Sequence, residues 1–381
     1  MNHYRLSVFF QQIAFGISAL IPLFWREGLK LSESSIGIIS AIGTIVSLCS
    51  PIVYGKIASV VSVEKPIAVA FFSYGICAFL YMLSDAFFPS FFSQTIIFCL
   101  HEITKWGFFT LVPVGVLQIL GSRTGSEYGK YRSFGSIGYL LGAMGAGILS
   151  DSFGFKAMFF VMGVASIVAA YPFYKHIKIP ARKEQSTKFA ELLSRKKLRN
   201  FFLAVICLCT YMSFVFVFMP LRIRELGASN SDISIVLSLN GLLAIVGLFV
   251  LGPVIDSISS KHLLLAAVAS AFLRVGLMFF ATSLPGFYMI QILHLGTWVL
   301  IDLLYIKCTK ELVSPHQYAK FGALTLVSTS LGMAFGSVFG ALILKIFEMK
   351  YLFLFGSLLP LLAVPFIFKM YENETEEVLK S

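Results

Sequence analysis

Charge is scarce in this sequence. Only 13% of the 381 residues are Asp, Glu, Lys or Arg, whereas 57% are hydrophobic and the mean hydropathy is +0.86. A soluble domain is about 45–50% apolar and about 25% charged. A water-soluble fold of this composition would expose apolar side chains over almost its whole surface. The scarcity of charge therefore excludes that class and indicates a protein whose solvent is lipid.

Sequence motifs of catalysis and metal binding are also missing. The six cysteines all fall in apolar stretches without a C-x-x-C pair, which indicates packing residues rather than a disulfide or metal site. There is no H-E-x-x-H, G-x-S-x-G or acidic metal motif. We therefore expect no enzyme activity, no cofactor and no metal. The net charge of +11 sits mainly in short loops between apolar runs, which argues against a nucleic-acid partner.

Most of the sequence consists of long apolar runs. A membrane-spanning helix needs about 20 mainly apolar residues, and turn residues and charges divide the chain into such runs. The first run is of span length and lacks a small-residue cleavage site, so we interpret it as a spanning helix rather than a removable signal peptide. The twelve expected spans are residues 5–27, 35–58, 66–84, 90–119, 131–150, 156–174, 200–221, 232–255, 262–281, 286–308, 319–344 and 350–370.

Lysine and arginine predict how the chain lies in the membrane. With both termini in the cytoplasm, 21 of these residues lie on the inner side and 7 on the outer side, while Lys105 and Arg274 lie within spans. The positive-inside rule therefore favours cytoplasmic termini. The one long polar loop is either a contact for anionic lipid or a plain topology anchor. The expected domains are an N-terminal six-helix bundle, a cytoplasmic basic linker, a C-terminal six-helix bundle and an acidic cytoplasmic tail, at residues 1–174, 175–199, 200–370 and 371–381.

The two halves repeat one another at an offset of 197 residues. The segment 34–40 aligns with 231–237, and Gly55 then falls on Gly252. Parallel repeats of six helices predict two pseudo-symmetric bundles around a central cavity that opens to alternate sides of the membrane. Two closed halves in one chain also favour a monomer.

The expected span 90–119 carries charge near its middle. His101, Glu102 and Lys105, with Gln94, fall on one side of an ideal helix. A charge at the bilayer centre costs at least ~2.5–3.5 kcal/mol, so we expect these side chains to form a substrate or proton site facing the cavity. A Glu–Lys pair at i, i+3 also neutralises itself, and a purely structural role therefore stays open.

The expected span 286–308 has a polar stripe. At 100° per residue, its polar and amphipathic side chains fall within about 80° of arc. Asp302 is the best candidate for a proton-carrying carboxylate in the second half, and His294 fits either a proton relay or a satisfied hydrogen-bond partner. The stripe consists of Gln291, His294, Trp298, Asp302 and Tyr305.

Two further polar residues lie at membrane depth. Arg274 has no acid one turn away on its own helix, so its expected partner is Asp302 or the substrate. Asn240 fits either the cavity or a hydrogen bond between helices.

Three runs resemble those of a known family. Residues 128–138 are similar to a Y-G-R-x-R-x-x-G-S-I-G run, and residues 291–298 to a Q-x-L-H-x-x-T-F run. Gly252 and Asp256, followed by Lys261, resemble a G-x-x-x-D-basic loop. The chain thus resembles the major facilitator superfamily over nearly its whole length. Within it, the chain resembles the branch of lactose, phenylpropionate and nucleoside proton symporters.

The resemblance implies an all-α integral membrane protein of the major facilitator fold, with twelve transmembrane helices in two pseudo-symmetric six-helix bundles. It implies a permease of the inner membrane that moves a small organic solute by proton-coupled symport. It also implies conformational roles for Arg132, Gly252, Asp256 and Lys261. Asp302 stands where the phenylpropionate type has histidine, so proton coupling is expected to be arranged differently here. An uncoupled facilitator, an exporter and a lipid transporter on the same fold remain open alternatives.

Overall fold

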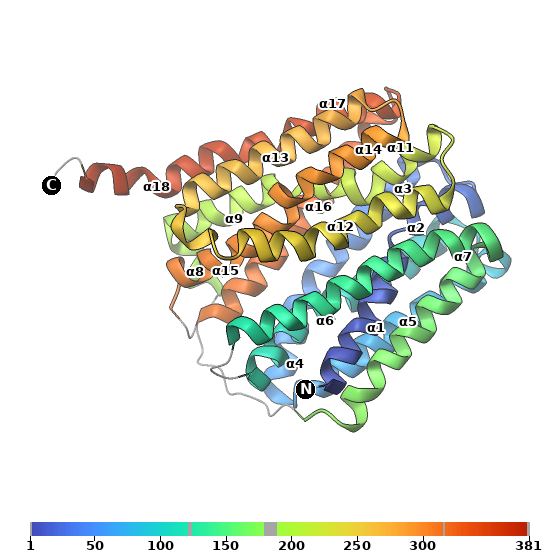
Figure 1. Cartoon of the computed structure of the whole chain (residues 1–381), viewed down its shortest axis with the longest axis horizontal. Helices are drawn as coiled ribbons and strands as arrows, with labels where there is room; N and C mark the ends of the chain where they lie inside the picture. The colour runs from blue at the N-terminus through green and yellow to red at the C-terminus, as the bar shows by residue number, and fades with distance from the viewer. Residues whose placement is uncertain (1, 121–123, 179–188, 315–316, 379–381) are drawn as a thin grey trace.

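The expected spans appear as helices. The computed structural model describes the backbone of residues 2–120, 124–178, 189–314 and 317–378. Within these ranges, eleven helical segments are long and apolar enough to cross a membrane. The longest, Ser133–Lys175, holds two expected spans, because α7 (Thr124–Lys175) bends at Gly154, where φ is 79°. Glycine adopts this backbone without a side-chain clash. Figure 1 shows the two arms of α7 running in opposite directions, so the prediction of twelve spans is confirmed.

The N-terminal half contains six spans, several of them divided into shorter helices. Its elements are α1 (Asn2–Ser18), α2 (Ile21–Leu23), η1 (Phe24–Gly28), α3 (Glu33–Val46), η2 (Ser47–Cys49), α4 (Ser50–Val60), α5 (Glu64–Phe87), α6 (Phe91–Leu120) and α7.

The C-terminal half repeats the arrangement after α8 (Phe189–Ser194), which lies within the expected linker. Its elements are α9 (Lys196–Cys209), α10 (Tyr211–Ser213), η3 (Phe214–Phe218), α11 (Met219–Glu225), α12 (Asn230–Leu251), η4 (Ile255–Ser257), α13 (Ser260–Phe280), α14 (Leu284–Ile290), η5 (Gln291–His294), η6 (Leu295–Val299), α15 (Leu300–Leu312), α16 (Tyr318–Ile343), α17 (Met349–Ser357), η8 (Leu359–Ala363) and α18 (Val364–Val378). Across both halves, η1, η3 and η6 are π-helical, and η2, η4, η5 and η8 are 3-10 helices.

Small residues bring the helices of each half together. A Cβ at Gly142 of α7 would lie 2.7 Å from the Cα atom of Ile13 in α1. A Cβ at Gly332 of α16 would collide in the same way with the backbone at Ile206 of α9. In lipid, where apolar surface alone does not hold helices together, close backbone approach supplies the packing contacts. Both halves use this device.

The halves meet along two pairs of helices, α7 with α12 and α3 with α16. A Cβ at Gly241 would lie 3.1 Å from the backbone nitrogen of Leu140, and one at Gly37 would lie 3.0 Å from the Cβ atom of Ala341. In Figure 1 the blue and green helices of the first half lie below the yellow and red helices of the second.

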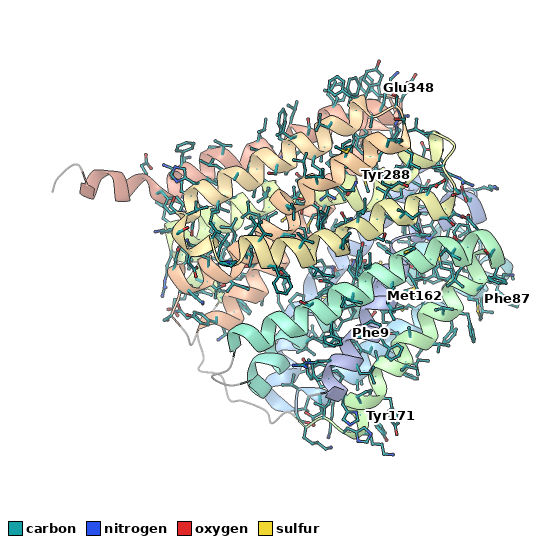
Figure 2. All side chains as sticks on the ribbon, in the orientation of Figure 1. Phe9, Phe87, Met162, Tyr171, Tyr288 and Glu348 are labelled. Carbon is teal, nitrogen blue, oxygen red and sulfur yellow. The ribbon has the colours of Figure 1, made fainter. Side chains whose placement is uncertain are left out.

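The outward surface of the spans is apolar. Phe87 and Tyr171, both labelled in Figure 2, are 68% and 52% exposed. Met162, on the same arm of α7 as Tyr171, is fully buried. Large exposed hydrophobic side chains occur along most of the spans, as expected of a surface that contacts lipid, whereas the segment Lys196–Glu225 is 78% buried and lies inside the bundle.

Charged side chains join the halves at the end that lies opposite α8 in Figure 1. Arg224 forms an ion pair with Glu27, and an Nη atom of Arg26 lies 4.0 Å from a carboxylate oxygen of Glu225. The other Nη atom of Arg26 donates to the carbonyl of Leu221 at 2.7 Å. We call Arg26, Glu27, Arg224 and Glu225 the Arg/Glu clasp, because it connects η1 with α11 across the boundary between the halves.

A second contact closes the same end. The carboxylate of Asp151 in α7 accepts hydrogen bonds from the backbone nitrogen and the hydroxyl of Ser231, at 2.7 and 2.6 Å. Ser231 lies in the first turn of α12, where backbone N–H groups have no partner within the helix and attract a negative charge. The first half therefore supplies a cap for a helix of the second.

Candidate functional site

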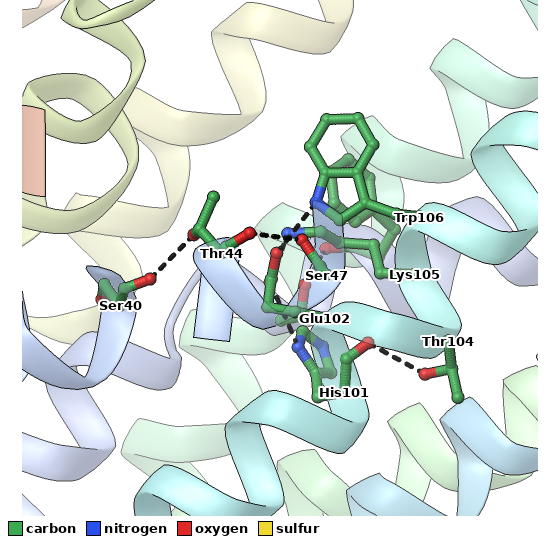
Figure 3. Close-up of polar contacts among 10 residues, drawn as sticks. Ser40, Thr44, Ser47, His101, Glu102, Thr104, Lys105 and Trp106 are labelled. Carbon is green, nitrogen blue, oxygen red and sulfur yellow. Dashed lines mark hydrogen bonds and ion pairs between the residues drawn. The ribbon is translucent and has the colours of Figure 1, made fainter. Parts of the chain in front are cut away.

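Glu102 lies at the centre of a buried cluster on α6. Its side chain is 2% exposed and forms an ion pair with Lys105, one turn further along the helix. The indole nitrogen of Trp106 donates to the second carboxylate oxygen at 3.1 Å. Figure 3 shows these side chains converging on the carboxylate between α3 and α6. The expected i, i+3 pair is therefore present, and both carboxylate oxygens have partners.

His101, expected in the same site, is enclosed by aromatic rings. Its ring centroid lies 4.6 Å from that of Tyr74 and 5.5 Å from that of Phe98. Its Nδ1 atom lies 3.5 Å from Glu102, but neither ring nitrogen makes a hydrogen bond. Gln94, on the same side of the helix, accepts a hydrogen bond from the indole of Trp25 at 3.1 Å and thereby ties η1 to α6.

Arg274 is the centre of a second buried cluster, in the other half. Its guanidinium donates to Asn240 at 2.9 Å and Gln291 at 2.6 Å through one Nη atom. The other Nη atom donates to Thr297 at 2.8 Å and lies 3.1 Å from Nδ1 of His294. Because a guanidinium has no acceptor, Nδ1 of His294 must accept, which places the proton of a neutral ring on Nε2. Three spans thus contribute to one cluster in which arginine carries the only charge.

Four of the expected site residues therefore meet: Asn240, Arg274, Gln291 and His294. The expected partner of Arg274 is Asp302 or the substrate. Among the described side chains, no contact joins Arg274 to Asp302. Asp302 lies half-buried on α15. The ring of Trp298 packs edge-on against Phe216, with centroids 6.2 Å apart.

The polar stripe is divided because this span is not a regular α-helix. Four residues of 3-10 helix, η5, are followed by five residues of π-helix, η6. A 3-10 segment turns further per residue than an α-helix, and a π segment turns less. Side-chain directions calculated with 100° per residue are therefore wrong across residues 291–299. Gln291 and His294 face Arg274 together with Thr297, which the spacing argument leaves out.

The comparisons with known proteins agree with this architecture. The model of the family described as MFS_1 like matches residues 3–355. The chain belongs to the MFS_1 like family. The resemblance to the major facilitator superfamily is thereby confirmed.

One curated relative of this MFS_1 like protein is the "Probable 3-phenylpropionic acid transporter" of Escherichia coli (strain K12), 28% identical over 187 residues. The match covers 46% of the chain and 48% of the relative, so it spans about half the length of that protein.

Solved structures agree with the fold. The crystal structure of the nucleoside transporter NupG (D323A mutant) matches with a TM-score of 0.82 at 14% identity, over 97% of this chain and 99% of that one. A POT family transporter in complex with a thioalcohol-conjugated peptide matches with a TM-score of 0.74 at 12% identity, over 98% and 96%. At these identities the likeness shows the major facilitator fold alone.

The loop motif of the MFS_1 like chain lies between α12 and α13. Gly252 directly follows α12, and Asp256 is exposed in η4. The Lys261 ammonium lies 4.7 Å from the ring centroid of Phe368. Arg132, expected to act with this motif, belongs to α7, but its side chain lies outside the described residues.

A residue not singled out from the sequence holds this loop in place. Lys307 of α15 donates to the carbonyls of Ile255 at 2.9 Å and Ile258 at 2.5 Å. Its neighbour Glu311 accepts from the hydroxyl of Ser260 at 2.6 Å. The loop is therefore bound to the span that also carries His294. Lys307 counts only as a basic loop charge in the sequence, and no spacing rule distinguishes it.

One other residue of the clusters could have been found from local spacing. Trp106 follows Glu102 by four residues within the α-helix α6, so the two side chains lie on one helix face. The same argument does not reach Thr297, because residues 291–299 are not α-helical. Within the described residues, no group of three or more His, Cys, Asp or Glu side chains is placed to hold a metal ion.

Proposed function

We propose that this protein is a secondary transporter that moves a small organic solute across the cytoplasmic membrane by alternating access, coupled to proton symport. The observation that carries the proposal is the pair of buried polar clusters, one centred on Glu102 and one on Arg274, each within a span of a different half. Buried charge at membrane depth is expensive and usually marks a substrate or proton path.

The relatives support the transport class. These relatives are named as a probable 3-phenylpropionic acid transporter, a nucleoside transporter and a POT family transporter, and none is named as an enzyme. The proposed site comprises His101, Glu102, Lys105, Asn240, Arg274, Gln291, His294, Trp298 and Asp302. Arg132, Gly252, Asp256 and Lys261 are proposed to guide the conformational change.

The closed end of the molecule fits one state of an alternating-access cycle. The Arg/Glu clasp and the Asp151 cap join the halves on the side opposite α8. We propose that this side is extracellular, that both termini are cytoplasmic, and that the protein acts as a monomer surrounded by lipid. A reporter enzyme active only outside the cytoplasm, fused after Ser381, would be inactive in this topology; an active fusion would contradict it.

Proton coupling is tested with purified protein in liposomes that contain a pH-sensitive dye. Sugars, nucleosides and aromatic acids are added in turn, and internal acidification is recorded together with uptake of labelled solute. We expect acidification that depends on a solute and disappears when a protonophore removes the proton gradient. Solute uptake without proton movement would instead establish an uncoupled facilitator, and proton release on uptake would indicate exchange.

A further inference from the structure

Hydrogen-bond donors without an acceptor surround Arg274. Four buried atoms here lack any hydrogen bond: Nε of Arg274, the hydroxyls of Tyr139 and Tyr211, and the amide nitrogen of Asn240. All four carry a hydrogen to donate. Buried polar groups without partners are rare in folded proteins, and each one needs an explanation. Two of the four atoms can only donate, and the two hydroxyls can donate as well as accept, so one acceptor placed among them would satisfy all four.

The tyrosines lie close to the guanidinium. Tyr139 and Tyr211 both lie close enough to Arg274 for Coulombic coupling between their ionisable groups. The Tyr139 hydroxyl approaches the Asn240 side chain without completing a hydrogen bond, and the Tyr211 hydroxyl stands in the same relation to Thr297. The four donors therefore share one small region at membrane depth.

The charge of this region is not balanced by the protein side chains that surround it. The four hydrogen-bond partners of Arg274 are uncharged groups. The ion pairs among the described side chains include none between Arg274 and a carboxylate. A buried cation with neutral neighbours favours an anionic partner. A neutral hydroxyl would satisfy the donors but would leave the charge unbalanced.

The region also touches both halves. Tyr139 belongs to α7 of the first half, whereas Tyr211, Asn240 and Arg274 belong to the second. The next residue after Asn240 is Gly241, whose Cβ position lies 3.1 Å from the backbone nitrogen of Leu140, the residue after Tyr139. A ligand bound here would therefore contact both halves at a point of close backbone approach, so that its binding would be linked to their relative movement.

We propose that Arg274, Tyr139, Tyr211 and Asn240 form a subsite for the carboxylate of the transported solute, so that the substrates are organic anions. This inference rests on the proposed function and specifies its substrate class. The guanidinium balances the carboxylate charge, while the two hydroxyls and the amide donate to its oxygens. Hydrogen bonds of this kind to a charged group are stronger than neutral ones.

Binding to the full-length protein in detergent tests the proposal. Dissociation constants are measured by calorimetry for carboxylates from acetate to 3-phenylpropionate, for the neutral amide of 3-phenylpropionate, for uridine, and for chloride and inorganic phosphate. We expect a carboxylate to bind at least about tenfold more tightly than its amide. Tyr139→Phe and Tyr211→Phe, which keep the ring and remove the donor, should each weaken carboxylate binding about tenfold or more.

Matched variants separate the subsite from general damage. Tyr351→Phe makes the same change on α17, where the ring packs against Phe279 and Phe347, and should leave carboxylate binding unchanged. Arg274→Lys keeps the charge but loses the planar fork, and should weaken carboxylate binding even where the melting temperature is that of the wild type.

Other outcomes overturn the inference in distinguishable ways. If uridine or a sugar binds and is transported while no carboxylate binds, the transport function stands and the anion subsite is wrong. Binding of chloride or phosphate alone would show an inorganic-ion site and would equally overturn a solute carboxylate. If the liposomes take up none of the solutes, the proposed function fails and this inference with it.

Discussion

Glu102 has neighbours that suit either a fixed charge or a proton carrier, and a pair of variants distinguishes the two roles. Glu102→Gln leaves the Lys105 ammonium buried with a neutral amide and the nearby ring of Trp106, 5.6 Å from its centroid. Removing one partner of a buried pair typically destabilises a protein by about 3–5 kcal/mol. We therefore expect a lower melting temperature for Glu102→Gln, and recovery towards wild type in the double variant Glu102→Gln/Lys105→Met.

Transport by the same double variant decides the role of Glu102. If the carboxylate carries the proton, the stable double variant loses proton-driven accumulation but still exchanges labelled for unlabelled solute across the liposome membrane. Return of proton-driven accumulation in the double variant would show that the pair is purely structural. The comparison uses two proteins of similar stability, so unfolding does not obscure the result.

The two buried clusters differ in how far the sequence predicts them. The Glu102–Lys105 pair lies on one helix, and its i, i+3 spacing alone brings the charges together. The partners of Arg274 come from α12 and from the span that includes η5 and η6. Their meeting depends on how three helices are rotated about their axes, which a single sequence does not define. Polar residues at membrane depth could be identified, but not their pairing.

At the scale of elements, spans could be predicted because hydropathy and length determine them, whereas their internal geometry could not. The twelve runs and the turns between them agree with the observed helices. The π segments η3 and η6 lie inside apolar runs whose composition does not distinguish them from α-helix. Such segments are often found at functional sites, and η6 here follows directly on His294.

At the same scale, Gly142 lies at a contact between helices that a single methyl group would disturb. Gly142→Ala places a Cβ within 2.7 Å of the Cα atom of Ile13, so α1 and α7 must separate. Overpacking of this kind typically destabilises a protein by about 1–3 kcal/mol. We expect a lower melting temperature in detergent and a smaller folded yield.

The control for this change lies on the same helix. Gly145 has no heavy atom within 4 Å of its Cβ position, so Gly145→Ala meets open space. Its melting temperature should equal or exceed that of the wild type, because alanine is the better helix former. Equal destabilisation by both substitutions would show that the loss comes from backbone flexibility and not from contact with α1.

At the scale of the whole molecule, we expect the Arg/Glu clasp to stabilise the conformation in which the two halves are closed at the end that carries the clasp. Its side chains are 21–35% exposed, and ion pairs of this exposure contribute about 0.2–1 kcal/mol each. Changing both Glu27 and Glu225 to Gln removes two such pairs, so it should shift the population towards the open state by roughly two- to thirtyfold. Spin labels at Phe87→Cys and Lys345→Cys, one on each half, report the separation, in a background without the exposed Cys49.

Charge reversal and salt complete the test of the clasp. Glu27→Arg combined with Arg224→Glu restores an attractive pair, so the short distance between the labels should return, while high ionic strength should lengthen it in the wild type. Asp85 forms an ion pair with Lys156 at 3.2 Å, and both residues belong to the first half. Asp85→Asn removes this pair and should leave the distance between the labels unchanged. An unchanged distance in the Glu27→Gln/Glu225→Gln protein would mean that close helix packing, as at Gly37, closes this end without help from the charges.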